Sequence, residues 1–118
     1  LPDTVNILSK QKTAEAKDFQ VEFQVNDKWD SGFNGELQVK NNTSNSIEGW
    51  TLVFDYEGQI NSFWEADIIE HNQNHYIIEN RGYNYKIPSG SILKLGFGGT
   101  STDRKPENYI LKHWMNQF

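Results

Sequence analysis

From Phe19 onward, apolar and polar residues alternate with a period of two, and this alternation constrains the fold more than any other feature. In the first alternating segment, residues 19–26, the side chains of Phe19, Val21, Phe23 and Val25 share one face. Further strand-like segments lie at 33–40, 47–56, 60–70, 76–80, 91–97 and 108–114. Polar turns separate them, and no segment from 19 to 118 has the period of an amphipathic helix. Short strands joined by such turns predict an all-β antiparallel sandwich or barrel.

The first part of the chain lacks this pattern. Residues 9–17 contain no bulky apolar side chain. We therefore expect 1–18 to be a linker or lead-in segment, with at most a transient helical turn, and 19–118 to form one module. The chain begins with Leu1-Pro2 rather than Met, which suggests a fragment processed or excised from a longer protein.

Charge and composition exclude several classes of function. The chain has 16 acidic and 11 basic residues, a net charge of −5, which disfavours nucleic acid or an anionic membrane as a partner. Cysteine is absent, so a disulfide, a thiolate metal site and a cysteine nucleophile are all excluded. Aromatic residues make up 14% of the chain, far more than a disordered segment carries.

Residues of the type used in catalysis or metal binding do not form a recognised motif. His71 and His75 are four apart, but they belong to a turn entering a strand, where this spacing separates side chains by about 13 Å. We therefore expect neither a metal nor a cofactor. Glu65, Asp67 and Glu70 could supply the carboxylate pair of a glycosidase, although the sequence alone does not give their separation.

The large aromatic residues divide into two groups. Trp50 alternates in phase with Leu52 and Phe54 and is predicted to lie in the core. Trp29, Trp64 and Tyr83 instead lie in separate polar turns, and exposed rings that gather on a surface usually mark a binding site. A flat ring suits the apolar C–H face of a sugar, while neighbouring polar side chains suit its hydroxyl groups.

Six ordered blocks make the sequence resemble a family 2 carbohydrate-binding module of bacterial cellulases and xylanases. The resemblance covers roughly 19–112. The blocks are Trp29-Asp30-Ser31-Gly32-Phe33, Val39-Lys40-Asn41, Ile47 to Phe54, Gly58 to Trp64, Asn80 to Gly90, and Leu95 to Gly99. It implies a two-sheet antiparallel β-sandwich of Greek-key, immunoglobulin-like or jelly-roll-like topology. It also implies no catalytic residues, and three coplanar rings that fall on Trp29, Trp64 and Tyr83.

The resemblance further implies which polysaccharide is bound. Gly32 stands where the xylan-binding subgroup tends to have Arg, and Tyr83 supplies the third ring that this subgroup lacks, so both positions favour cellulose. The family's usual third Trp is Tyr here, and its disulfide between the termini is missing. Its amide side chains around the rings are replaced at Asp27, Glu36, Ser62, Lys94 and Gly98. We expect the last strand, 108–114, to substitute for the disulfide as a tether, and Glu36 to be a candidate partner for Lys94.

These observations predict a secreted, monomeric, non-catalytic module that binds cellulose or a related β-1,4-linked polysaccharide and tethers a catalytic domain to it. Trp29, Trp64 and Tyr83 would stack on the sugar rings. Hydroxyl contacts are predicted for Asp27, Asn61, Asn84 and Lys94. Two alternatives stay open: a protein-interaction sandwich that uses the same rings as its interface, and a small glycosidase.

Overall fold

The computed structural model describes residues 11–100 and 105–114. Their regular structure is almost entirely β, with one short 3₁₀ helix, η1 (Ala16–Asp18). The strands are β1 (Gln11–Thr13), β2 (Phe19–Trp29), β3 (Gly32–Asn41), β4 (Ile47–Glu48), β5 (Thr51–Asp55), β6 (Ile60–Phe63), β7 (Ala66–Asn72), β8 (His75–Asn80), β9 (Lys86–Ile87), β10 (Ile92–Gly99) and β11 (Glu107–Trp114).

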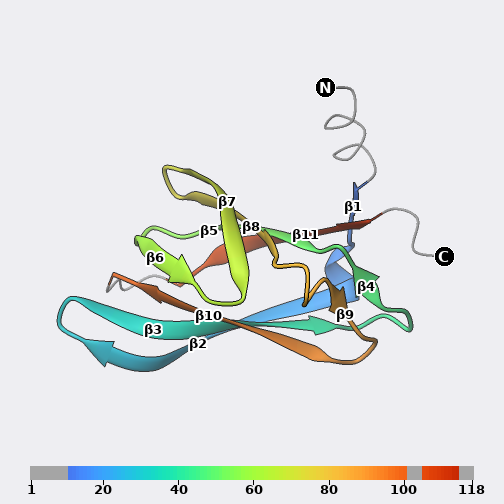
Figure 1. Cartoon of the computed structure of the whole chain (residues 1–118), viewed down its shortest axis with the longest axis horizontal. Coiled ribbons are helices and arrows are strands. Elements are labelled where there is room, and N and C mark those ends of the chain that lie inside the picture. The colour runs from blue at the N-terminus through green and yellow to red at the C-terminus, as the bar shows by residue number, and fades with distance from the viewer. Residues whose placement is uncertain (1–10, 101–104, 115–118) are drawn as a thin grey trace.

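Two antiparallel sheets form the layers of a sandwich. One sheet has the order β1-β11-β5-β8-β7 and the other the order β2-β3-β10-β6, while β4 and β9 form a small separate pair. Figure 1 shows β2, β3 and β10 as long ribbons along the lower side of the molecule, and β5, β8 and β11 along the upper side. The predicted two-sheet β-sandwich is therefore confirmed.

Aromatic side chains fill the space between the sheets. Phe97 of β10 has Phe33, Tyr56 and Phe63 around it, with ring centroids 4.9 to 6.4 Å away. Trp50 is 1% exposed, and its Nε1 donates a hydrogen bond to the carbonyl of Asn84 at 2.7 Å. The prediction that Trp50 belongs to the core is confirmed. This aromatic core compensates for a hydrophobic content of only 36%.

Two of the predicted strands are interrupted. Segment 47–56 breaks into β4 and β5 at Gly49, whose φ of +68° lies in the left-handed region that favours glycine. Segment 60–70 breaks into β6 and β7 because the backbone bends at Trp64 and Glu65. Neither break falls at a cluster of polar turn residues like those between the other strands, so the sequence predicted each segment as one continuous strand. The break at Trp64 is the one that shapes the candidate site.

The prediction that 1–18 is a lead-in needs correction for its second half, because residues 11–18 belong to the sandwich. Strand β1 pairs with β11, Gln11 opposite Trp114, and Ala14 packs against the core. The expected helical turn corresponds to η1. Residues 1–10 lie outside the described residues. The pairing of β1 with β11 joins the two ends of the sandwich by backbone hydrogen bonds, the role expected of the last strand.

Candidate functional site

Trp29 faces solvent because of a β-bulge. Continued alternation from Val25 would turn Asp27 and Trp29 toward the core. The register between β2 and β3 shifts, however: Val25 lies opposite Gly35, whereas Asp27 lies opposite Asn34. Asn26 is the extra residue, and it reverses the phase of the strand. Asp27 and Trp29 thus join the solvent side of the four-stranded sheet, which we call the outer face.

Each of the two outer-face indoles lies on a glycine. A Cβ atom at Gly32 would come 3.4 Å from Cζ2 and Nε1 of Trp29 and 2.6 Å from the carbonyl oxygen of Gly99. A Cβ atom at Gly96 would come 2.8 Å from Cε3 of Trp64. Because these glycines have no side chain, both indoles can lie close to the backbone, and each remains nearly half exposed, at 47% for Trp29 and 48% for Trp64.

The bend after β6 brings the Trp64 indole over β10. The backbone N–H of Trp64 donates to the carbonyl of Gly96 at 3.0 Å. The backbone N–H of Gly96 in turn donates to Oε1 of Glu65 at 2.7 Å. Gly98, the next outward position of β10, lies opposite Asn34, two residues along β3 from Gly32. The two glycines that support the indoles therefore occupy neighbouring strands of one face.

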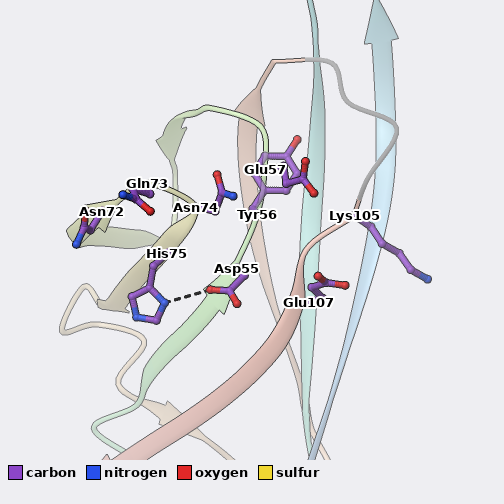
Figure 2. Close-up of a pocket in the computed structure, with 9 residues that line it drawn as sticks. All are labelled: Asp55, Tyr56, Glu57, Asn72, Gln73, Asn74, His75, Lys105 and Glu107. Carbon is purple, nitrogen blue, oxygen red and sulfur yellow. Dashed lines mark hydrogen bonds and ion pairs between the residues drawn. The ribbon is translucent and has the colours of Figure 1, made fainter.

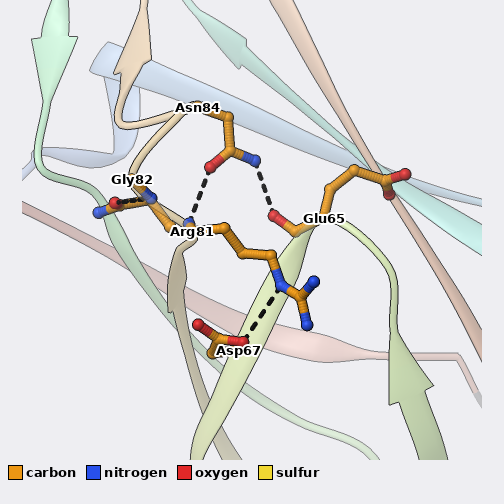
Figure 3. A network of polar contacts seen from close by, with 6 residues as sticks. Glu65, Asp67, Arg81, Gly82 and Asn84 are labelled. Atoms are coloured by element: carbon orange, nitrogen blue, oxygen red, sulfur yellow. Dashed lines mark hydrogen bonds and ion pairs between the residues drawn. The ribbon is translucent and has the colours of Figure 1, made fainter.

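Tyr83 is carried by the turn between β8 and β9. The amide of Asn84 holds this turn: its Oδ1 accepts from the backbone N–H of Arg81 at 2.9 Å, and its Nδ2 donates to the carbonyl of Glu65 at 2.7 Å. The guanidinium Nε of Arg81 pairs with Asp67 at 3.1 Å (Figure 3). The network ties the Tyr83 turn to the residue that follows Trp64. Tyr83 itself is 74% exposed.

We call Trp29, Trp64 and Tyr83 the aromatic strip. They come from three separate parts of the chain, and all three are exposed. Of the polar residues predicted beside them, Asp27 and Lys94 lie on the outer face, and Asn61 is the extra residue where the register of β6 and β10 shifts. Asn84 differs, because it uses one N–H and one lone pair of its amide to bind backbone groups.

A row of polar side chains also occupies the outer face, and three of them, Gln24, Asn26 and Gln38, are not among the residues selected from the sequence. Asn26 and Gln38 both donate to the carboxylate of Glu36, and Gln38 also donates to Gln24. The bond from Gln38 is the main reason that the pKa of Glu36 lies below its usual value, with smaller contributions from Asn26 and from the positive charge of Lys94. Lys94 is thus close enough to act on Glu36 electrostatically. Gln24 and Asn26 could have been found from the sequence, because they are polar residues that alternate with the apolar ones in segment 19–26.

The residues considered for catalysis have other roles. Glu65 binds the Gly96 amide, and Asp67 pairs with Arg81. His71 stacks on Tyr76 with ring centroids 3.9 Å apart, whereas His75 bonds to Asp55. Among the described residues, no group of three or more acidic or histidine side chains could hold a metal ion. No helix in the described segments is both long and apolar enough to cross a membrane.

A separate polar hollow of about 300 Å³ lies at one end of β5 and β8, away from the strip. Figure 2 shows the bond between Nδ1 of His75 and Asp55, 3.1 Å long, at its edge. Apart from the polar imidazole of His75, the one aromatic ring among its lining residues is that of Tyr56, which is 1% exposed. It therefore offers no flat apolar surface to a sugar ring.

Comparison with known sequences identifies relatives over nearly the whole sandwich. The sequence family described as "Cellulose binding domain" matches residues 19–113. Endoglucanase B of Cellvibrio japonicus is 32% identical over 82 residues, which are 68% of this chain and 16% of the endoglucanase. The chain therefore corresponds to a small part of that relative's length.

Solved structures give the same fold. Chitinase ChiA74 from Bacillus thuringiensis superposes with a TM-score of 0.74 and 36% identity, covering 78% of this chain and 15% of the chitinase. The chitin-binding domain of Chi18aC from Streptomyces coelicolor superposes with a TM-score of 0.64 and 28% identity, covering 81% of this chain and 91% of that domain. Similar proteins thus include an endoglucanase, a chitinase and a chitin-binding domain.

Proposed function

The chain belongs to the cellulose binding domain family, and from this membership we propose that it holds an attached glycoside hydrolase on insoluble cellulose through the aromatic strip. It is a carbohydrate-binding β-sandwich, and its own role in the proposal is binding rather than hydrolysis. The proposal includes secretion, a monomeric state and a catalytic domain on the same polypeptide. Keeping that domain near its insoluble substrate raises its effective concentration there.

The observation that carries the proposal is the pair of half-exposed indoles lying on glycine backbone. An indole supported in this way has few alternative orientations, so it loses little conformational entropy when a sugar stacks on it. The absence of a side chain at Gly32 supports a flat ligand, because a longer residue there would push the Trp29 ring away from the sheet. Cellulose presents such flat chains of β-1,4-linked glucose.

In this proposal the polar residues have two kinds of role. Asp27, Asn61 and Lys94 contact sugar hydroxyls, because they are exposed beside the strip. Asn84 is a positioning residue as well as a candidate contact, because two of its amide's hydrogen-bonding positions hold the Tyr83 turn. Glu36, ionised and bonded to its amide neighbours, offers a further acceptor on the same face.

Chitin is the second candidate ligand, favoured by the 36% identity to a chitinase. Chitin has the same β-1,4 linkage, with an N-acetyl group on each sugar. The strip suits the C–H faces of both polymers, so the rings alone do not discriminate between them. The alternative to carbohydrate binding is protein interaction, in which a protein partner covers the strip.

A depletion assay tests the proposal. The protein is mixed with microcrystalline cellulose, chitin or insoluble xylan, and the protein left in solution is measured. We expect retention on cellulose, and Trp29→Ala and Trp64→Ala should each weaken it by about tenfold or more. Ile69→Ala removes an equally exposed apolar side chain from the other sheet and should leave retention unchanged. Unchanged retention in a folded Trp29→Ala/Trp64→Ala protein would contradict the proposal, and stronger retention on chitin would replace cellulose as the ligand.

A further inference from the structure

A third exposed indole lies on a glycine, and it belongs to the other sheet. Trp114 is the last residue of β11 and is 46% exposed. Its ring stacks on that of Tyr85, with centroids 5.6 Å apart and planes 28° apart. Beneath the indole is Gly49, where a Cβ atom would clash with the ring atoms Cδ2, Cε2 and Nε1. We call Trp114, Tyr85 and Gly49 the Trp114 platform.

The strand register fixes the platform on the solvent side of the five-stranded sheet. Leu111 is 0% exposed and His113 is 8% exposed, so these two face the core, and Lys112 and Trp114 face outward. Lys112 pairs with Thr51 on β5. Extending this antiparallel register by two residues places Gly49 opposite Trp114. Figure 1 shows the end of β11 at the opposite end of the long axis from the β2–β3 turn, where β2 ends at Trp29.

The indole is held in one orientation from below and from the side. The N–H of Gly49 donates to the carbonyl of Tyr85 at 2.8 Å, which joins the glycine to the ring that stacks on Trp114. Gly49 has a φ of +68°, so both its conformation and the space above it exclude other residues. On the neighbouring strand β1, Gln11 pairs with Trp114 and donates through Nε2 to Thr51 at 3.1 Å.

We infer that the Trp114 platform is a second carbohydrate-contact site, which stacks on one pyranose unit of a β-1,4-linked polysaccharide. The inference rests on the proposed function for the class of ligand, and on the platform's own geometry for the site. Trp114 on Gly49 repeats the construction of Trp29 on Gly32 and Trp64 on Gly96: a half-exposed, flat ring supported by backbone. Polar groups flank it, since Glu48 and Lys86 form an ion pair at 3.9 Å beside Gly49 and Tyr85.

A second contact on the other sheet would add to the avidity of the module for a polymer surface, where many chains are presented at once. It would not require the strip, because the two sites share no residue. The four indole groups of the protein also provide separate reporters. Trp50, which is buried and bonded to Asn84, reports on the turn that carries Tyr83.

The test is a titration of ¹⁵N-labelled protein with cellohexaose or chitohexaose, following the Nε1–H signal of each tryptophan. Signals are assigned with single Trp→Phe variants. We expect the Trp114 signal to shift in a saturable manner. The same shift should persist in the Trp29→Ala/Trp64→Ala/Tyr83→Ala protein, with a dissociation constant changed by less than about threefold.

The outcomes separate the two proposals. Shifts at Trp29 and Trp64 with a silent Trp114 overturn the second site alone. A shift at Trp114 with silent strip signals overturns the strip and keeps the platform, and silence at all three overturns both. A Trp114 shift that disappears when the strip residues are replaced is transmitted rather than direct, and also overturns the inference.

Two further variants test the platform itself. Trp114→Phe keeps a flat ring and should retain weakened binding. Ile110→Ala, on the same face of β11, is the control for a stability effect.

Discussion

Oε1 of Glu65 accepts a hydrogen bond from the backbone N–H of Gly96 at 2.7 Å, in the position where a continued β6 would offer a carbonyl. Strand β6 stops at Phe63, opposite Phe97, and the N–H of Trp64 still reaches the carbonyl of Gly96. The side chain of Glu65 thus completes the hydrogen bonding of β10 while the backbone bends away. The bend is what allows the Trp64 indole to lie on Gly96.

Glu65→Ala should therefore weaken both the fold and polysaccharide binding. Loss of the acceptor leaves the half-buried N–H of Gly96 without its partner, at a cost of about 1 kcal/mol in the free energy of unfolding. Retention on cellulose should fall several-fold because Trp64 loses its fixed position. Urea unfolding and the depletion assay measure the two effects. Glu65→Gln keeps an acceptor oxygen and should restore most of both, so a Gln variant as impaired as the Ala variant would contradict this role.

Gly96→Ala should impair binding with little loss of stability. The new methyl group would come 2.8 Å from Cε3 and 3.3 Å from Cζ3 of Trp64, so the indole must lift away from the sheet. Exposed on its other side, the ring can move without disturbing the core, and we expect binding to fall by roughly tenfold. Gly98→Ala is the control, because its methyl group would meet Trp64 only at 3.9 Å. Equal losses in the two variants would argue against this explanation.

The sequence predicted the sheets better than it predicted their irregularities. Alternation predicted the strand at 33–40, which is most of β3, and the burial of Trp50, because the core selects apolar residues at every second position. It did not predict that Asn26 would reverse the phase of β2. A β-bulge changes which way the later residues face without changing the local composition, so only the partner strand reveals it.

The candidate site shows the same limit. The sequence predicts that Trp29, Trp64 and Tyr83 lie in polar turns, where large rings are unusual, and all three are exposed. Trp29, however, is the last residue of β2 rather than part of a turn. The glycines beneath the indoles were not assigned that function, because they support rings from distant parts of the chain. Trp114 was expected only to help tether the last strand. Its distance in sequence from Gly49 and Tyr85 concealed the platform that they form together.

Tyr83→Trp should strengthen binding to cellulose. Tyr83 is 74% exposed on a turn held by the amide of Asn84, so a larger ring fits without a clash with the core. An indole covers more of a sugar ring than a phenol does, and we expect retention to increase by roughly two- to fivefold. Binding isotherms on cellulose measure the change. The same substitution in the Trp29→Ala/Trp64→Ala protein should have little effect, since one ring alone gives weak retention.

Asp55 should make the stability of the protein sensitive to acid. Its Oδ2 accepts from Nδ2 of Asn108 at 2.9 Å, and its Oδ1 is bonded to Nδ1 of His75 at 3.1 Å. These bonds, that of Asn108 first, lower the pKa of Asp55 in the folded protein. The unfolded chain, with the ordinary pKa of about 4, then binds more protons than the folded chain as pH falls below that value. The stabilisation is present above about pH 4 and is lost as pH falls through the lowered pKa.

In the Asp55→Asn protein, the free energy of unfolding should therefore decrease less steeply as the pH falls below about 4. Urea unfolding at a series of pH values measures this slope. Asn108→Gly should flatten it in the same direction, because it removes the first of the two donors while relieving the φ of +59° at that position. Asp30→Asn, in the exposed turn between β2 and β3, controls for the loss of one carboxylate. An Asp55→Asn profile that runs parallel to that of the unmodified protein would show that the bonds to Asn108 and His75 do not favour the ionised form.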